Sequence, residues 1–161
     1  MTKLNNRWQH LLQAVGVVLL ITTLVGCNGE EPDKGPATAS ISGYNHTEDY
    51  IHRFFINDSW GGGASAYEGG GSVCCIGYPR EWRPELTATV RWSTSASRNK
   101  PFTGVTWHEQ VVPIEYYDKL GSLNVHFLPD NKVRLLIWNG SAGSRGYRGP
   151  AAPVKPADWL Y

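Results

Sequence analysis

Two adjacent cysteines, Cys74 and Cys75, are the side chains whose type and spacing first suggest chemistry. A zinc site needs about four ligands, which is more than the surrounding stretch offers. Redox pairs usually have two residues between the cysteines and lie at a helix N-terminus, and the sequence shows neither feature. We therefore expect a structural pair, either a vicinal disulfide or two buried thiols on opposite faces of a strand. Pairing with another chain is a third alternative.

No catalytic constellation is visible elsewhere in the sequence. The patterns Gly-x-Ser-x-Gly, Gly-x-x-x-x-Gly-Lys-Ser/Thr and His-Glu-x-x-His are all absent. His46 and His52 are six residues apart and His108 adjoins Glu109, and neither pair has the spacing of a metal motif. We interpret each histidine as an exposed or hydrogen-bonded strand residue. The sequence therefore predicts no enzyme activity, no bound metal and no cofactor.

The N-terminus has the pattern of a secretory signal peptide. Lys3 and Arg7 precede an apolar run, Leu11–Val25, which is followed by a small residue and Cys27. The run of 15 residues is shorter than the roughly 20 that span a bilayer, so we favour a cleaved signal over a transmembrane anchor.

The four residues Leu24–Cys27 resemble the lipobox of bacterial lipoproteins. This resemblance implies cleavage before Cys27 and acylation of Cys27, so that the lipid bilayer becomes a partner through the attached chains. Residue 28 is Asn and not Asp, which implies export to the outer membrane. The expected location is the periplasm, where free exposed thiols do not persist.

These features divide the chain into a signal peptide (1–26), a lipidated tether (27–39) and one domain (40–161). Removing the signal leaves 135 residues with 13 basic and 14 acidic side chains, a formal charge of −1. Nucleic-acid binding requires a strongly basic surface, so we exclude nucleic acid as a partner.

Strand patterns dominate the domain. In residues 85–93, Leu86, Ala88, Val90 and Trp92 alternate with polar residues, which predicts a strand with one buried face. Residues 123–138 predict a hairpin with a turn at Pro129-Asp130-Asn131. Segments 50–57 and 103–112 are two further strands, and 39–46 and 72–78 are weaker candidates. The fold class is therefore mainly β, as a single small antiparallel sandwich or a partly open barrel.

Three segments do not fit this strand pattern. Residues 60–71 contain six glycines, which predicts a loop or a place where backbones approach closely. Residues 113–121 could form one helical turn. The Gly/Pro-rich tail from 139 to 161 predicts irregular chain that docks through Trp159, Leu160 and Tyr161.

The tryptophans are the main candidates for contact with a partner. Trp92, Trp107 and Trp138 fall in strands, so we assign them to the core. Loop tryptophans and arginines are typical anchors of protein interfaces, although such a tryptophan can equally cover the core. The candidate partner-binding residues are Trp60, Tyr67, Arg80, Glu81, Trp82 and Arg83.

Residues 41 to 93 contain Gly-Tyr-Asn-His-Thr at 43–47, a Gly-rich stretch, Cys-Cys at 74–75, and Pro-x-x-Trp-Arg-Pro at 79–84. On these motifs the segment resembles a family of small Gram-negative lipoproteins grouped as a domain of unknown function. Members are often encoded beside type VI secretion genes, near lipase effectors. The resemblance implies an immunity protein that binds and neutralises a secreted phospholipase effector, and it brings no catalytic residues. The alternative is a structural or glycan-binding envelope lipoprotein.

Overall fold

The computed structural model of the protein describes residues 35–96 and 101–159. The predicted signal peptide, Cys27 and most of the predicted tether lie outside these residues. The described chain forms eight strands: β1 Ala37–Asn45, β2 Tyr50–Ile56, β3 Ser59–Ala64, β4 Gly69–Tyr78, β5 Thr87–Ser95, β6 Thr106–Pro113, β7 Ser122–Leu128 and β8 Lys132–Trp138.

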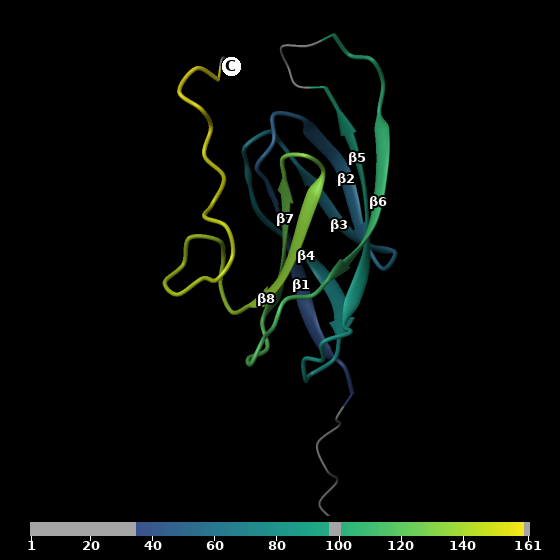
Figure 1. The fold of residues 1–161 in the computed structure, drawn as a ribbon, viewed down its shortest axis with the longest axis vertical. Helices are drawn as coiled ribbons and strands as arrows, with labels where there is room; N and C mark the ends of the chain where they lie inside the picture. The colour runs from purple at the N-terminus through teal and green to yellow at the C-terminus, as the bar shows by residue number, and fades with distance from the viewer. Residues whose placement is uncertain (1–34, 97–100, 160–161) are drawn as a thin grey trace, which may run out of the picture. The chain divides into compact units, whose positions relative to one another are not determined.

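The strands form two four-stranded sheets with orders β4-β1-β7-β8 and β3-β2-β5-β6 (Figure 1). The predicted mainly β fold is confirmed, and the architecture is a sandwich and not a closed barrel. All strand pairs are antiparallel except β1 with β7. These two strands are parallel because the chain passes through the second sheet between them, which provides the long crossover that parallel pairing requires.

The core lies between the two sheets, where the alternating apolar residues meet. Ala88, Val90 and Trp92 of β5 are buried, as the alternation predicts. The predicted hairpin is also present, since Leu123 lies opposite Ile137 and Val125 opposite Leu135.

The glycine-rich stretch is not a loop along its length, because β3 and the start of β4 lie within it. Close approach explains the glycines of β3. A Cβ atom on Gly61 would collide with the ring of Phe54, the largest side chain that is fully buried. Gly43 of β1 meets the same ring, with a Cβ position 2.7 Å from its Cε1 atom.

Two predicted boundaries are corrected by the structure. Strand β1 begins at Ala37, within the predicted tether, because Ala37 and Ala39 are buried and pair with β4. The helical turn expected in 113–121 is absent, and Ile114 instead forms a bridge to Leu135 of β8. In the described ranges, no helix has the length and apolar character needed to cross a membrane.

Residues 139–159, here the C-terminal segment, contain no strand and pack on the outer face of the β4-β1-β7-β8 sheet (Figure 1). Tyr147 hydrogen-bonds to His126 of β7, and the backbone N–H of Ala142 donates to Tyr44 of β1. The predicted docking of the tail is seen at Trp159, whose ring meets Tyr67 edge-on. Leu160 and Tyr161 lie outside the described residues.

Candidate functional site

One end of the sandwich holds a pocket of about 420 Å³, here the end pocket. Its rim is formed by the β1–β2 loop (residues 46–49), the β7–β8 turn (residues 129–131) and the first residue of β8, Lys132. Apolar side chains of Ile51, Trp92, Phe127 and Leu128 contribute to its lining. Ile51, Trp92 and Phe127 are at most 2% exposed, so the surface of the end pocket is formed mainly by its polar and charged rim.

Asn45 holds the rim of the end pocket together. Its buried side chain accepts hydrogen bonds from the backbone N–H and the hydroxyl of Thr47. Its amide group donates to the carbonyl oxygens of Asp49, Ala64 and Ser65. One asparagine thus fixes the loop after β1 against the loop after β3.

Beside the pocket, His46, His126 and Tyr147 form a chain of hydrogen bonds. His46 Nε2 is 2.8 Å from His126 Nδ1, and His126 Nε2 is 2.5 Å from the hydroxyl of Tyr147. Tyr44 stacks on His126 with ring centroids 4.7 Å apart. Both ring nitrogens of the fully buried His126 are therefore hydrogen-bonded. The other end of the chain of bonds, His46, lines the end pocket.

Burial keeps these two histidines neutral. Desolvation lowers the pKa of His126 to about 3, with smaller contributions from His46 and Arg134. Desolvation also lowers the pKa of His46 and raises that of Tyr147. The sequence predicts an exposed or hydrogen-bonded strand histidine; His126 is hydrogen-bonded, and the structure adds that it is completely buried.

A second candidate lies on the outer face of the β3-β2-β5-β6 sheet. Here Trp60, Phe55, Arg91 and Glu109 are consecutive register partners across the four strands. Together with Arg53 and Trp107 they form what we call the arginine–aromatic face.

The exposed groups of this face contact one another. The guanidinium carbon of Arg91 lies 5.0 Å from the ring centroid of Phe55 and 5.7 Å from that of Trp107. Arg53 lies 5.9 Å from the Trp107 ring. Trp60 and Trp107 are 57% and 50% exposed, so two large apolar rings are presented to solvent beside two guanidinium groups.

The six predicted partner-binding residues are dispersed by the fold. Trp60 is exposed and belongs to the arginine–aromatic face. Trp82, in contrast, is half-buried against the core, and its indole N–H donates to the carbonyl of Ile114 at 2.8 Å. The interpretation of Trp82 as an interface anchor is therefore replaced by the alternative that it covers the core.

The remaining candidates also have local structural contacts. Tyr67 is half-buried between the end pocket and Trp159. Arg80 donates to the carbonyl of Gly35, and Arg83 lies 3.6 Å from Glu85. Glu81 is exposed. These residues do not form a common surface with Trp60.

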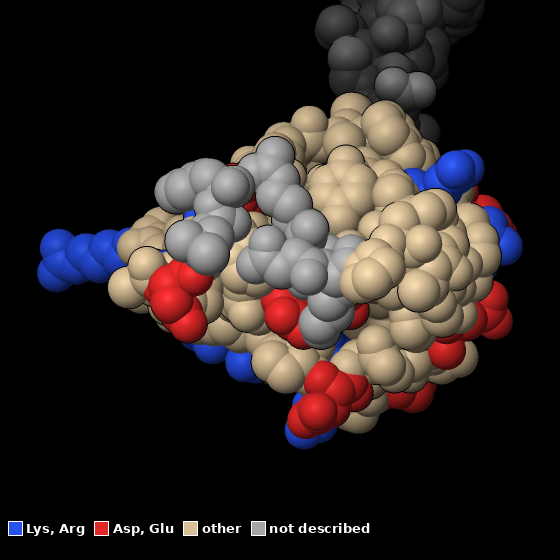
Figure 2. Space-filling view, turned by 90° about the horizontal axis from the view of Figure 1, so that it is seen from above, with Lys and Arg blue, Asp and Glu red and all other residues tan. Residues whose placement is uncertain are grey.

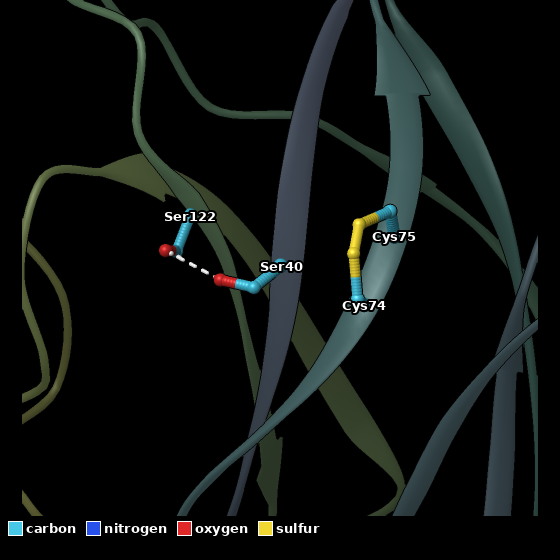
Figure 3. The surroundings of a disulfide bond; sticks show 4 residues. All are labelled: Ser40, Cys74, Cys75 and Ser122. Atoms are coloured by element: carbon cyan, nitrogen blue, oxygen red, sulfur yellow. Dashed lines mark hydrogen bonds between the residues drawn. A yellow bond between two sulfur atoms is a disulfide. The ribbon is translucent and has the colours of Figure 1, made fainter.

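Cys74 and Cys75 are joined as a vicinal disulfide on β4 (Figure 3). Both are exposed, so the buried-thiol alternative does not describe them. β4 is an edge strand, and its register with β1 passes from Ser40–Cys74 to Ala39–Ile76, which leaves Cys75 as the extra residue of a bulge. A bulge on an edge strand interrupts its hydrogen-bonding edge and so hinders pairing with a strand of another molecule. The position of the disulfide therefore favours a structural role.

Two functional candidates are absent from the sequence prediction, for different reasons. The predicted core position of Trp107 is wrong, since the side chain is 50% exposed. Trp107 alternates in phase with the charged Glu109, and that phase is the signal for exposure in the sequence. His126 alternates with core residues and so falls on the outer face of β7. Nothing in the strand pattern shows that the C-terminal segment covers it.

Within the described ranges, no group of three or more His, Cys, Asp or Glu side chains is arranged to hold a metal ion. Neither the curated proteins nor the solved structures contain a match to the chain. The family model DUF3304, described as a protein of unknown function, matches residues 44–135. The match includes the lining of the end pocket and the whole arginine–aromatic face. Because it covers more than half of the 161 residues, the chain belongs to the DUF3304 family.

Proposed function

We propose that this protein is a periplasmic lipoprotein, anchored to the outer membrane through Cys27, that binds and neutralises a type VI secreted phospholipase effector. The arginine–aromatic face is the surface that binds the effector. Three grounds support the proposal: the family resemblance, the lipobox-like residues Leu24–Cys27, and a surface suited to protein recognition. It requires no cofactor and no catalytic activity of the chain itself.

The observation that carries the proposal is the composition of the exposed face. Tryptophan and arginine are enriched among the residues that dominate protein–protein binding energy. Here Trp60, Trp107, Arg53 and Arg91 lie together on ordered strands. A rigid surface loses little conformational entropy on binding, so more of the contact energy remains as affinity.

The contrast between the two sheets supports the assignment. The outer face of the β4-β1-β7-β8 sheet is covered by the C-terminal segment through Tyr147 and Ala142. The arginine–aromatic face instead keeps half or more of its two tryptophan side chains in solvent. A hollow of about 500 Å³ among Arg53, Phe55, Arg91 and Trp107 offers room for a side chain of the partner.

Attachment to the membrane suits this role. A phospholipase delivered to the periplasm acts on bilayer lipid, so an inhibitor tethered at that bilayer is concentrated where damage would occur. Inhibition then needs only a complementary surface that blocks access to the effector's active site.

Glycan binding is the second candidate, because exposed tryptophan rings can stack on sugars. The arginines argue against it. Arg91 and Arg53 lie over the Trp107 ring at distances typical of cation–π contacts, so they compete with a sugar for that ring.

A protection assay tests the proposal in cells. A strain lacking the gene is complemented with the wild-type chain, with Arg91→Ala or with Trp107→Ala, and is then exposed to a type VI secreted phospholipase effector. The wild-type chain should restore survival. Each variant should weaken effector binding about 30-fold or more, and survival should fall accordingly. The double variant Arg80→Ala/Tyr116→Ala is the matched control, since it removes an exposed arginine and an exposed aromatic elsewhere. Survival of the deletion strain equal to that of the parent would reject the immunity role.

A further inference from the structure

In the described chain the two sheets end in the edge strands β4, β8, β3 and β6, and the first three of these edges are blunted. The bulge at Cys75 interrupts β4, and the register of the short β3 with β2 shifts twice. The edge of β8 is partly covered, because its Leu135 accepts the backbone N–H of Glu115. β6, by contrast, keeps an unbroken antiparallel register with β5 over all eight of its residues. A long and regular edge strand is a template for pairing with another chain.

Hydrogen bonds next to β6 show which of its backbone groups face β5. The N–H of Ile114, the residue after β6, donates to the carbonyl of Leu86 at 2.8 Å. Because the groups alternate along an antiparallel ladder, the even-numbered residues of β6 face β5. On the far side of β5, Asn57 hydrogen-bonds to both backbone groups of Thr89. This agrees with the same phase, since Thr89 lies opposite the odd-numbered Val111.

The odd-numbered residues Trp107, Glu109 and Val111 therefore turn their N–H and C=O groups to the open side of β6. In the described ranges no residue hydrogen-bonds to these groups. The side chains of Trp107 and Val111 are 50% and 70% exposed, and Phe102 and Val105, which precede β6, are exposed as well. The edge thus offers free backbone donors and acceptors beside apolar surface, which is the combination that strand addition uses.

Glu109 gives this edge a charge preference. Its register partner on β5 is Arg91, but the guanidinium group of Arg91 lies over the rings of Phe55 and Trp107. Among the described residues, no basic group forms an ion pair with Glu109. The carboxylate is therefore available to a basic residue opposite it on an added strand, and such opposite charges stabilise a strand pair. Residues two positions to either side on that strand lie opposite Trp107 and Val111, where apolar side chains fit.

A second copy of the chain fits this edge poorly. Antiparallel pairing of two β6 strands through all of their outward-facing residues places Glu109 opposite Glu109, and like charges in that position destabilise a strand pair. The overall charge is close to balance, with 15 basic and 14 acidic residues, and Figure 2 shows both signs interspersed at one end of the molecule. The local pattern along β6 therefore selects the partner more than the overall charge does.

We propose that β6 accepts an extended segment of a protein partner as a fifth strand of its sheet. The added strand runs antiparallel to β6, as all neighbouring strands do in this sheet. It carries a basic residue opposite Glu109 and apolar residues opposite Trp107 and Val111. Trp107 and Glu109 also belong to the arginine–aromatic face, so a partner that covers this face is in place to add the strand. The identification of that partner as the effector rests on the proposed function.

A model peptide tests strand addition on the full chain in detergent. The probe is acetyl-Thr-Val-Thr-Lys-Thr-Val-Thr-amide, and ¹H–¹⁵N NMR should show saturable shifts at residues 106–112. N-methylation of the lysine removes an N–H that faces β6, so this analogue should bind at least about tenfold more weakly. N-methylation of the threonine before the lysine changes an N–H that faces away, and affinity should stay within about twofold. Equal affinities of the two analogues, or no saturable shifts with the parent peptide, would overturn the proposal.

The charge preference has a control of its own. Glutamate in place of the peptide's lysine puts a like charge opposite Glu109 and should weaken binding at least about threefold. In Glu109→Gln this preference for the lysine peptide should disappear. Equal binding of the two peptides to the wild-type chain would contradict the proposed basic residue, and so would a preference that persists unchanged in Glu109→Gln.

Val111→Pro tests the edge in the protein itself. Proline removes an N–H that points to the open side of β6 and leaves the ladder to β5 intact, so an edge strand tolerates it while an added strand is blocked. Binding of the parent peptide should fall at least about tenfold. Val111→Thr keeps the N–H and the β-branched shape and should bind within about twofold of wild type. Undiminished binding by folded Val111→Pro would overturn the proposal. If thermal unfolding shows that Val111→Pro does not fold, the N-methylated peptides give the same test on the wild-type chain.

The effector separates this inference from the proposed function. A type VI secreted phospholipase effector should bind Val111→Pro at least about tenfold more weakly than wild type. If it binds Val111→Pro as tightly as wild type but binds Arg91→Ala weakly, strand addition by the effector is overturned and the immunity role stands. If it binds none of the chains, the immunity role fails, and the peptide measurements alone decide whether β6 accepts a strand.

Discussion

At the scale of single residues, Asn45 links three backbone segments, although its position in the sequence motif gives no sign of this role. Its side chain is fully buried and makes five hydrogen bonds, to the loop that follows β1 and to the end of β3 and the loop beyond it. Its neighbours have equally specific places: Gly43 admits the Phe54 ring, Tyr44 stacks on His126, and His46 lines the end pocket. The Gly-Tyr-Asn-His-Thr sequence is therefore a structural unit that builds the rim of the pocket.

Replacing Asn45 with alanine should destabilise the fold strongly. The change leaves buried carbonyl and N–H groups without partners, each at a cost of about 1–3 kcal/mol, so we expect a loss of roughly 2–4 kcal/mol. Chemical denaturation monitored by circular dichroism measures this loss. Asn139→Ala, at an exposed position, is the control and should change stability by less than about 0.5 kcal/mol. A loss below about 1 kcal/mol for Asn45→Ala would mean that water replaces the missing amide.

At the scale of elements, the close packing of β3 against β2 depends on glycine. Gly61 faces the ring of Phe54, and a side chain there has no space. Gly71 belongs to the same glycine-rich stretch, but nothing lies within 4 Å of its Cβ position. Glycines that look equivalent in the sequence thus have different roles in the sheets.

Gly61→Ala and Gly71→Ala form a matched pair that tests this difference. Overpacking by one methyl group against a buried ring should cost about 1–3 kcal/mol in Gly61→Ala. Gly71→Ala should be neutral or slightly stabilising, because alanine reduces the entropy of the unfolded chain. Thermal unfolding of the two variants side by side gives the comparison. Equal melting temperatures would show that β3 moves to accommodate the methyl group.

The C-terminal segment is the second element with a specific role. It has no regular structure, yet Tyr147 and Ala142 bring it onto β7 and β1, and Lys155 pairs with Glu68 beyond β3. This cover is what buries His126 and makes β7 inaccessible on both faces.

At the scale of the whole molecule, the buried histidine links stability to pH. Folded His126 has a pKa of about 3, while a histidine in the unfolded chain has a value near 6.5. Between these values the unfolded chain binds more protons than the folded protein, so acid favours unfolding. The stability due to neutral His126 is fully present above about pH 6.5 and is lost as the pH falls toward about 3.

We expect the free energy of unfolding to fall with decreasing pH in this window, by at most about 1.4 kcal/mol per pH unit from one histidine. His126→Phe should remove that part of the slope, even if it also lowers stability at every pH. Asn139→Ala, which changes no titratable group at an exposed position, should keep the slope. Urea denaturation at a series of pH values measures both. Parallel curves for His126→Phe and wild type would show that His126 does not contribute to the pH dependence.

The sequence by itself determined the mainly β fold, the β5 strand and the β7–β8 hairpin. Alternation of apolar residues reports directly which side of a strand is buried, as at Val90 and Leu135. It could also have assigned Trp107 to the exposed face, through its phase with Glu109.

Only the tertiary structure decided which residues from distant segments meet. Residues 46–49 and 129–132 form one pocket because β1 and β7 pair in parallel, although they are far apart in the chain. His126 is buried by Tyr147, which belongs to a segment without any periodicity. Trp82 turned toward the core because the carbonyl of Ile114 accepts its N–H. Periodicity describes one strand at a time, whereas a site and its burial depend on contacts between elements.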